Sequence, residues 1–408
     1  MSELSYLEKL LDGVKVEWKT LGKVLKRTKG TKITAGQMKA LHKDNAPLKI
    51  FAGGKTVAFV DFKDIPEKDI NREPSIIVKS RGIIEFEYYD KPFSHKNEMW
   101  SYHSNNDAIS IKYIYYFLKI NEGYFQKIGG KMQMPQIATP DTDKFEVPIP
   151  CPDNPEKSLA IQSEIVRILD KFTELTAELT AELNMRKKQY NYYRDQLLSF
   201  KEGEVEWKTL GEIGKWYGGG TPSKNKIEFW ENGSIPWISP KDMGRTLVDS
   251  SEDYITEEAV LQSSTKLIPA NSIAIVVRSS ILDKVLPSAL IKVPATLNQD
   301  MKAVIPHENI LVKYIYHMIG SRGSDILRAA KKTGGSVASI DSKKLFSFKI
   351  PVPNINEQQR IVEILDKFDT LTNSITEGLP REIELRQKQY EYYRDLLFSF
   401  PKPETVSN

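Results

Sequence analysis

The sequence of 408 residues has almost no cysteine and no long apolar run, and both absences exclude whole classes of protein. The single cysteine, Cys151, leaves no partner for an internal disulfide and excludes a zinc site built from cysteines. No stretch approaches the roughly 18 consecutive apolar residues of a membrane-spanning helix. Residues 1–5 show neither the basic start nor the apolar core of a secretory signal. We therefore expect a cytoplasmic protein in a reducing compartment.

The sequence also lacks the short motifs of common catalytic and nucleotide-binding sites. It contains neither the GxSxG of a serine hydrolase nor the HExxH of a zinc protease, and its five histidines are scattered. The glycine run at residues 218–224, GGGTPSK, lacks the spacing of a phosphate-binding P-loop. Residues 154–156, Asn-Pro-Glu, are not the Asn/Asp-Pro-Pro-aromatic string of an adenine methyltransferase. These absences predict a chain with no catalytic residue and no metal site.

What the sequence does contain is an internal repeat whose period is about half the chain. Three blocks recur in the same order: EWKTLG at residues 17–22 and 206–211, an ILDKF block at 167–172 and 363–368, and a tyrosine-rich block at 186–200 and 386–400. The residues between the blocks differ. This pattern predicts two divergent globular parts, each followed by a repeated helical part. The start of the chain also resembles the end of the first repeated helix, which predicts a closed, pseudo-twofold arrangement.

The repeated parts carry apolar residues at alternating spacings of three and four, the pattern of a coiled-coil seam. The first seam runs from Ile165 to Leu197 and the second from Ile361 to Leu397. Two seams in one chain can satisfy each other, so we predict two long antiparallel coiled-coil helices within the chain. A homodimeric coiled coil is the alternative.

Proline and glycine mark the borders of these helices. The proline-rich stretches at residues 148–152 and 351–353 predict linkers before each helix. Gly378 and Pro380 predict a break inside the second helix.

A tandem four-residue repeat, TAELTAEL, occupies residues 176–183 of the first helix. The candidate spacer residues in it are Thr176, Leu179, Thr180 and Leu183. One unit of α-helix adds about 6 Å and a net turn of about 40°. Gain or loss of one unit is therefore predicted to change the separation of whatever the two globular parts bind.

The globular parts are predicted to be mixed α/β domains. Residues 75–80 and 272–279 are rich in branched apolar residues and are bounded by Gly, Pro and Asn, as strands are. Residues 111–127 and 310–331 predict a short helical stretch in each part.

Basic residues outnumber acidic residues only slightly, 58 to 54, so a nucleic-acid footprint has to come from local clusters. Residues 23–32 and 322–332 are such clusters, although a solvated surface would look the same. Glycine pairs beside lysines in both halves favour a phosphate contact, with Gln and Ser reaching base edges. The candidate DNA-binding residues are Lys29, Lys32, Lys79, Arg81, Lys131 and Gln133 in the first part, and Gly220, Thr221, Ser223, Lys224, Lys241, Arg278, Lys331, Lys332, Gly334, Gly335 and Ser336 in the second. The aromatic residues Trp100, Trp230 and Trp237 are predicted to lie in the core, and Tyr190, Tyr193, Tyr390 and Tyr393 to pack the helix ends.

Three strings in the second half carry a family resemblance. Residues 218–243 read GGGTPSKNKIEFWENGSIPWISPKDM, residues 298–300 read NQD, and residues 349–369 read KIPVPNINEQQRIVEILDKFD. The chain resembles the DNA-specificity subunit of type I restriction-modification systems over its whole length, and within that family it looks most like the enterobacterial type IC group. The first half departs from the pattern because it has no GGTPS string.

The resemblance implies target-recognition domains at residues 1–147 and 204–350, and conserved helical regions at 148–203 and 351–408. Each domain would read one half of a bipartite, asymmetric DNA site. The helices would set the spacer and dock two methyltransferase subunits, which restriction-translocation subunits then join. The chain would direct adenine methylation and restriction without being an enzyme itself. S-adenosylmethionine, ATP and magnesium would belong to the partner subunits. The alternative is a coiled-coil DNA-binding or adaptor scaffold outside restriction-modification.

Overall fold

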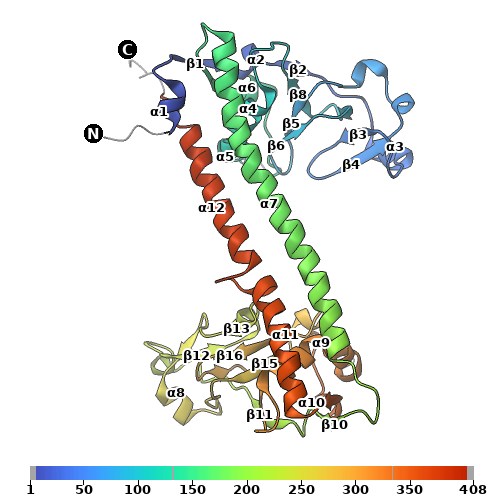
Figure 1. The fold of residues 1–408 in the computed structure, drawn as a ribbon, viewed down its shortest axis with the longest axis vertical. Coiled ribbons are helices and arrows are strands. Elements are labelled where there is room, and N and C mark those ends of the chain that lie inside the picture. The colour runs from blue at the N-terminus through green and yellow to red at the C-terminus, as the bar shows by residue number, and fades with distance from the viewer. Residues whose placement is uncertain (1–5, 131–132, 333, 402–408) are drawn as a thin grey trace. The chain divides into compact units, whose positions relative to one another are not determined.

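The computed structural model describes residues 6–130, 133–332 and 334–401 (Figure 1). The chain divides into two compact units, of which the first combines two separate stretches of sequence and the second is one continuous stretch. Unit 1 comprises Met1–Thr176 and Arg386–Asn408, and unit 2 comprises Ala177–Leu385. Each unit therefore contains one globular domain together with parts of both repeated helical regions.

Unit 1 is a mixed α/β domain built on a four-stranded sheet in the order β2-β8-β5-β6. A second sheet in the order β4-β3-β7 forms a smaller lobe with α3, and β1 pairs with β9. The helices are α1 (Tyr6–Leu11), α2 (Leu21–Val24), α3 (Ala35–Leu41), α4 (Ile111–Ile120), α5 (Glu122–Gly129), α6 (Thr139–Asp143) and the first part of α7 (Pro155–Leu197). The strands are β1 (Val16–Thr20), β2 (Lys26–Thr28), β3 (Leu48–Phe51), β4 (Val57–Val60), β5 (Ser75–Lys79), β6 (Glu85–Tyr89), β7 (Phe93–His95), β8 (Trp100–His103) and β9 (Glu146–Pro150).

Unit 2 contains a five-stranded sheet in the order β11-β18-β15-β16-β13, which α9 covers. A small sheet in the order β14-β12-β17 lies in the same unit, and β10 pairs with β19. The strands are β10 (Glu206–Thr209), β11 (Gly214–Gly218), β12 (Ile235–Ile238), β13 (Leu247–Val248), β14 (Tyr254–Ile255), β15 (Ser272–Val276), β16 (Ser288–Ile291), β17 (Thr296–Leu297), β18 (Met301–Pro306) and β19 (Lys349–Val352). The helices are α8 (Glu257–Gln262), α9 (Val312–Ala330), α10 (Ser342–Ser347), α11 (Ile355–Asn373) and α12 (Leu379–Leu397), of which the last part of α12 belongs to unit 1.

The main sheets of the two units follow one plan. The order β2-β8-β5-β6 corresponds to β11-β18-β15-β16, and all neighbouring strands in both series are antiparallel. Ile76 of β5 pairs with Tyr102 of β8, just as Ile273 of β15 pairs with Val304 of β18. The globular parts are thus more alike than their sequences indicate, because buried apolar residues can be exchanged while the strand pairing stays the same.

The proline-rich stretches are strands and not linkers, which corrects the sequence-based prediction. In β9, Pro148 pairs with Trp18 of β1, and in β19, Pro351 pairs with Trp207 of β10. Each pair is a two-stranded sheet, so both strands are edges and tolerate a residue without an N–H. The EWKTLG block at the start of each globular part is therefore fastened to the end of that part. The expected boundaries after residues 147 and 350 fall inside these strands.

The second repeated helix is interrupted as predicted. Helix α11 ends at Asn373 and α12 begins at Leu379. Gly378 has a φ of 82°, and a β-carbon there would overlap the carbonyl oxygen of Thr370. Only glycine fits this conformation and this space without strain.

Ring stacking joins the repeated helices in both units. In unit 1 Phe172 of α7 stacks on Tyr393 of α12, with ring centroids 5.4 Å apart. In unit 2 Tyr193 of α7 stacks on Phe368 of α11 at 5.6 Å. The partner's number falls from 393 to 368 as the number along α7 rises from 172 to 193. Antiparallel helices require this order, so the predicted antiparallel pairing within the chain is confirmed.

The end of each repeated helix packs into a globular core. Leu397, Phe398 and Phe400 belong to the core of unit 1, and the indole of Trp18 donates to the carbonyl of Pro401 at 3.0 Å. The predicted return of the C-terminal helix to the N-terminal segment is therefore confirmed. Leu198 occupies the matching place in the core of unit 2.

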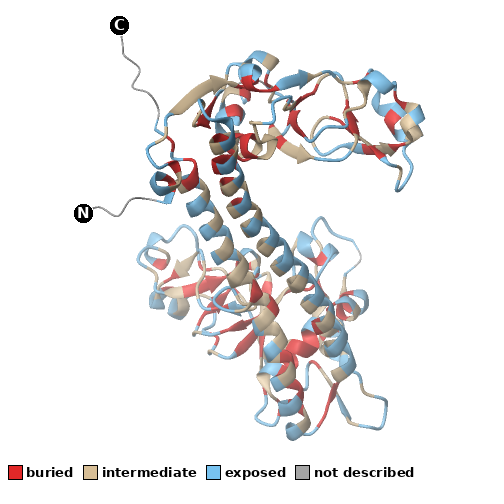
Figure 2. Cartoon of the chain, turned by 45° about the horizontal axis from the view of Figure 1, so that its top comes forward, coloured by how far each residue is buried: buried red, intermediate tan, exposed pale blue. Residues whose placement is uncertain are grey.

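Burial changes along α7, the longest helix (Figure 2). All of α7 is described, and it has no buried residue between Leu169 and Tyr190. Leu169 belongs to the core of unit 1 and Tyr190 to the core of unit 2. The TAEL repeat thus lies outside both cores, with Leu179 and Leu183 half-buried. None of the described helices is long and apolar enough to cross a membrane.

Candidate nucleic-acid interface

One edge of the five-stranded sheet in unit 2 brings together segments that are far apart in the sequence. Because neighbouring strands are antiparallel, the ends of β11 and β15 meet the start of β18 at the same edge. The amide of Gly220, just after β11, donates to the carbonyl of Leu297 at 2.8 Å. The hydroxyl of Thr221 donates to the side-chain oxygen of Gln299, just before β18. The GGT and NQD strings of the sequence therefore form one loop cluster.

This loop cluster is held rigidly from beneath. A β-carbon on Gly219 would overlap the carbonyl oxygen of Asn298, so the two backbones approach each other as only glycine permits. The carbonyl of Gly220 accepts hydrogen bonds from the indole of Trp237 at 2.9 Å and from the hydroxyl of Thr265 at 2.7 Å. Trp237 is buried, as predicted, and its ring meets that of Trp230 edge to face.

Arg278 stands at the same edge, directly after β15. Its side chain is 60% exposed, and its Nε lies 3.5 Å from Oδ1 of Asp300. That carboxylate oxygen is buried, and within the described part of the chain it accepts no hydrogen bond. Asp300 thus lies beside the Nε of Arg278, while the exposed guanidinium keeps most of its donors available.

The glycine-containing segment before α10 runs beside Arg278. The amide of Ser279 donates to the carbonyl of Ala338 at 3.0 Å, and the backbones of Arg278 and Ser339 pair as an isolated antiparallel β-bridge. Gly334 and Gly335 both have positive φ and, like Lys332 and Ser336, they are exposed. The structure thus gathers these predicted residues around one edge. Lys331 faces Asp283, with Nζ 2.6 Å from the carboxylate.

Of the other predicted residues of unit 2, Lys241 is less free to meet DNA, whereas Ser223 and Lys224 are exposed. Lys241 follows β12 and contacts the carboxylates of Glu252 and Asp253, each at 2.9 Å. Hydrogen bonds to these two acids raise the pKa of Lys241, so its charge is already compensated. Ser223 and Lys224 lie in the exposed turn after the GGT loop, where the carbonyl of Ser223 accepts from Trp230.

Unit 1 repeats this edge with different loops. Arg81 follows β5 as Arg278 follows β15, and both arginines stand six residues after the serine that opens the strand. The amide of Ile137 donates to the carbonyl of Ser80, as that of Ile340 does to Val277. Arg81 is exposed, so the two domains present an arginine at equivalent positions.

An acid also occupies the equivalent position before the neighbouring strand. Strand pairing places Glu98 before β8 where Asp300 stands before β18. Burial favours the neutral form of Glu98, but the hydrogen bond and charge of Lys96 and the charge of Arg81 hold its pKa below the ordinary value. Lys29 and Lys32 follow β2 and are exposed, which adds two cations in the segment that leaves this edge.

Lys79, one of the candidate DNA-binding residues, is buried, which corrects the prediction that it contacts DNA. Its side chain is 7% exposed, and Nζ lies 2.6 Å from Glu85 and 2.8 Å from Glu87. Two carboxylates of β6 thus compensate its charge, which disfavours a contact with phosphate. Gln133 is exposed, and Lys131 lies outside the described residues. Contact with DNA stays a prediction for the remaining candidates.

Each domain is fastened to its helix by residues that the sequence did not single out as functional. In unit 1 Asp170 of the ILDKF block accepts from Lys112 at 2.7 Å and from the hydroxyl of Tyr116 at 2.5 Å. In unit 2 Asp366 pairs with Lys313, and its carboxylate lies 2.9 Å from Nε2 of His317. The signal in the sequence was a KYIY string at residues 112–115 and 313–316.

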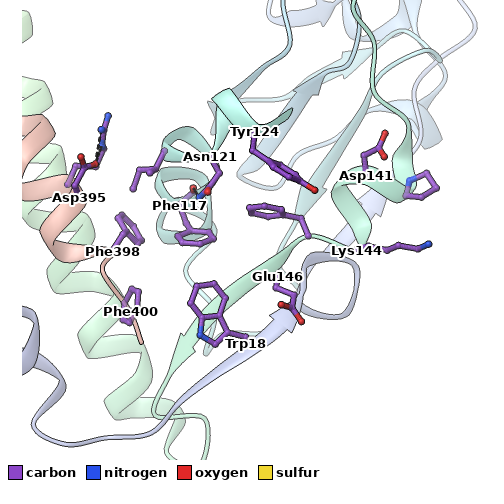
Figure 3. Close-up of a pocket in the computed structure, with 14 residues that line it drawn as sticks. Trp18, Phe117, Asn121, Tyr124, Asp141, Lys144, Glu146, Asp395, Phe398 and Phe400 are labelled. Carbon is purple, nitrogen blue, oxygen red and sulfur yellow. Dashed lines mark hydrogen bonds and ion pairs between the residues drawn. The ribbon is translucent and has the colours of Figure 1, made fainter. Parts of the chain in front are cut away.

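Unit 1 also contains an open cavity of about 980 Å³ beside the end of α12 (Figure 3). Its aromatic lining comes from Trp18, Phe117, Tyr124 and Phe398, among others. At the matching helix end in unit 2, the hydroxyl of Ser321 of α9 donates to Asp195 at 2.9 Å. The described residues of both units contain no group of His, Cys, Asp and Glu able to hold a metal ion.

Comparison with known proteins agrees with this architecture. The sequence profile of the type I restriction modification DNA specificity domain matches residues 14–186 and again 202–385. The chain is 73% identical to the EcoR124I/EcoR124II specificity subunit of Escherichia coli over the full length of both proteins. It is 37% identical to the EcoprrI specificity subunit of Escherichia coli, over 92% of this chain and 93% of that one.

A solved structure shares the fold. The type I restriction-modification S subunit from M. genitalium superposes with a TM-score of 0.61 at 18% identity, over 96% of this chain and 98% of that one. The double match of the family profile coincides with the two structural repeats, and the Escherichia coli relatives confirm the enterobacterial resemblance. The chain belongs to the family of type I restriction-modification DNA-specificity subunits.

Proposed function

We propose that each globular domain reads one half of a bipartite, asymmetric DNA site. The observation that carries this proposal is the equivalent sheet edge of the two units, where Arg81 and Arg278 occupy the same position while the surrounding loops differ. A shared cation suits a feature common to every site, the phosphate backbone. Loops that differ suit the part of the site that differs, the base edges in the major groove.

In this proposal, the repeated helices set the distance between the half-sites and dock two methyltransferase subunits. The chain itself is not catalytic. S-adenosylmethionine is held by the methyltransferase subunits, and ATP and magnesium by restriction-translocation subunits that join the complex in the cytoplasm. A methyltransferase must flip its target adenine out of the duplex, so it depends on another protein surface for position and strand. Joining two readers also makes the second half-site contact effectively intramolecular.

The helical spacer offers the sharpest test. Deletion of residues 176–179 removes one TAEL unit from a part of α7 that belongs to neither core. It shortens the helix by about 6 Å and removes a net turn of about 40°. At roughly 3.4 Å per base pair, we expect a spacer shorter by one or two base pairs and unchanged half-sites.

The assay is sequencing of methylated adenines in DNA from cells that carry the chain and its methyltransferase subunit. A length-preserving control replaces Thr176 and Thr180 by serine, and its motif should match that of the unaltered chain. An unchanged spacer after the deletion would show that the helices do not set the spacer, and it would not contradict the proposal that the two domains read the half-sites. If no methylated motif depends on the chain at all, the adaptor alternative becomes the better account.

A further inference from the structure

The turns that precede β8 and β18 have the same structure in the two units. In unit 2 the amide of Met301 donates to the carbonyl of Asn298 at 3.2 Å, and in unit 1 the amide of Met99 donates to the carbonyl of Lys96 at 3.0 Å. The strand pairing equates these residues, because β8 and β18 occupy the same place in the two main sheets. The two turns are therefore equivalent positions of one fold.

A glycine after the neighbouring strand supports each turn. A β-carbon on Gly30, which follows β2, would overlap the carbonyl oxygen of Lys96, and the same kind of overlap occurs at Gly219, which follows β11. The amide of Thr31 then donates to the carbonyl of His95 at 2.7 Å, which repeats the contact of the GGT loop in unit 2. The first domain thus builds the same support without the GGTPS string.

Each turn carries an exposed side-chain amide at the same position. Asn97 in unit 1 and Gln299 in unit 2 are both exposed, and each directly precedes the acid of its edge, Glu98 or Asp300. Asparagine and glutamine differ by one methylene and carry the same pair of hydrogen-bonding groups, a carbonyl oxygen and an NH₂. The two turns therefore present the same chemistry.

The neighbours of the two amides differ. Lys32 stands two residues after Gly30, as Thr221 stands two residues after Gly219. It is exposed and lines an open cavity of about 410 Å³ together with Asn97, among other residues. The flanking side chain thus changes from a hydroxyl to a cation between the domains, while the amide is present in both.

The contacts of Gln299 fix which end of its amide faces which neighbour. Its Nε2 lies 3.4 Å from Oδ2 of Asp300, and a carboxylate only accepts hydrogen bonds. The hydroxyl of Thr221 donates to its Oε1. The oxygen still has a second lone pair and the nitrogen a second hydrogen for a ligand. An amide that is oriented in advance loses less entropy when it binds.

We propose that Asn97 and Gln299 are base-specific contacts, each reading an adenine of its half-site through N6 and N7. In the major groove adenine presents a donor beside an acceptor, and an amide matches both. Guanine presents two acceptors there, cytosine one donor, and thymine one acceptor beside a methyl group, so no other base is matched by both amide groups. This inference rests on the proposed function, in which each half-site contains an adenine, and a group present in both domains suits a base present in both half-sites.

The experiment replaces single adenines of the target duplex by 7-deazaadenine, in which a C–H stands in place of the N7 acceptor. The motif is first determined by sequencing of methylated DNA, and each duplex is then titrated with the complex of the chain and its methyltransferase subunit. In each half-site one adenine should be sensitive, with binding weakened about fivefold or more. Gln299→Ala should abolish the sensitivity in one half-site only, and Asn97→Ala in the other only, because the lost atom and the lost amide belong to one contact.

Two further variants sharpen the test. Gln262→Ala is a matched control that should keep both sensitivities, since Gln262 is also an exposed glutamine whose amide donates to a carboxylate, that of Glu258 at 2.7 Å, but lies on α8. Gln299→Glu keeps the length of the side chain and only accepts hydrogen bonds, so it should favour cytosine over adenine at the sensitive position. The substituted duplexes test the unaltered chain as well, so the result does not depend on a variant that folds.

Binding that tolerates 7-deazaadenine at every adenine of a half-site would overturn the inference for that domain. Sensitivity that persists in Gln299→Ala would assign the N7 contact to another residue. A loss in Gln299→Ala that is equal for all duplexes, whatever their sequence, would make the amide a phosphate contact. If a motif depends on the chain in each of these cases, the proposed function stands. If no motif depends on the chain, the proposed function fails, and this inference fails with it.

Discussion

Replacement of Arg278 by glutamine tests whether the shared arginine contacts the DNA backbone. In the ion pair of Arg278 with Asp300 the arginine side chain is 60% exposed and the aspartate side chain 21% exposed, so loss of the arginine leaves a mostly buried carboxylate without its partner. Thermal unfolding of the variant is therefore measured first, and a change in DNA binding at an unchanged unfolding temperature reports the contact itself. Because Arg81 takes the same place in a domain with different loops, we expect a phosphate contact and not a base contact.

The size of the effect follows from counterion release. One phosphate contact adds about 0.9 to the slope of log K against log salt for duplex DNA. A fourfold rise in salt, from about 50 to 200 mM, therefore weakens binding about 3.5-fold less in the variant than in the unaltered complex. The loss at low salt should be the same for the correct site and for sites mutated in either half.

The assay is a salt titration of fluorescent duplex binding by the complex of the chain with its methyltransferase subunit. Arg360→Gln is a matched control, since Arg360 is also an exposed arginine paired with a carboxylate, that of Glu357, but lies on α11. If the slope is unchanged and affinity is lost only for sites that contain one particular base pair, Arg278 contacts a guanine and not a phosphate. Unchanged affinity at every salt concentration would refute any role of Arg278 in DNA binding.

Two further predictions concern the parts that hold the interface in place. Asp366→Asn removes the charge that Lys313 and His317 face, and should lower the thermal stability of the chain measured by calorimetry. Burial acts against the charged form of Asp366, but hydrogen bonds from His317 and Lys313 lower its pKa below the ordinary value of 3.8. The stabilisation is therefore fully present at a pH above 3.8 and is lost as the pH falls through the lowered pKa. A pH–stability curve identical to that of the Asn variant would contradict this. Gly219→Ala forces the GGT loop away from Asn298. We expect methylation to lose its dependence on the half-site read by this domain, while the other half-site is still read. Sequencing of methylated DNA that shows both half-sites intact would contradict the rigid loop.

The internal repeat made the helical parts predictable, because the apolar seam and the breaking residues are local in the sequence. The break at Gly378, the antiparallel pairing and the return of Phe400 to the N-terminal segment all followed from it. The proline-rich strands were mistaken for linkers because proline excludes helix without distinguishing an edge strand from a loop. Only the pairing partner, more than 100 residues away, settles that choice.

The candidate interface was predictable in kind but not in detail. Glycine and basic residues pointed to loops that the structure brings together at one edge of unit 2, and Arg81 and Arg278 are both exposed at the equivalent edge. Lys79 failed because its partners, Glu85 and Glu87, are reached only through strand pairing. Asp300 and Glu98 were missed for the same reason. A sequence shows which side chains carry charge, and the register of the sheet decides which charges are already compensated.

The anchors explain why the TAEL segment suits a spacer. Along α7, Asp170 is fastened to the globular domain of unit 1, and Tyr190 to that of unit 2 through a contact of 3.2 Å with His317. The repeat lies between these two anchors and contributes to neither core, so its length can change without creating a cavity. The second repeated helix is interrupted between Asn373, where α11 ends, and Leu379, where α12 begins. Such an interruption can absorb a change in length that a continuous helix could not. We therefore expect deletion or insertion of one TAEL unit to leave the thermal stability of both units nearly unchanged, whereas the same change placed between Ile161 and Leu169, inside the core of unit 1, should destabilise the chain.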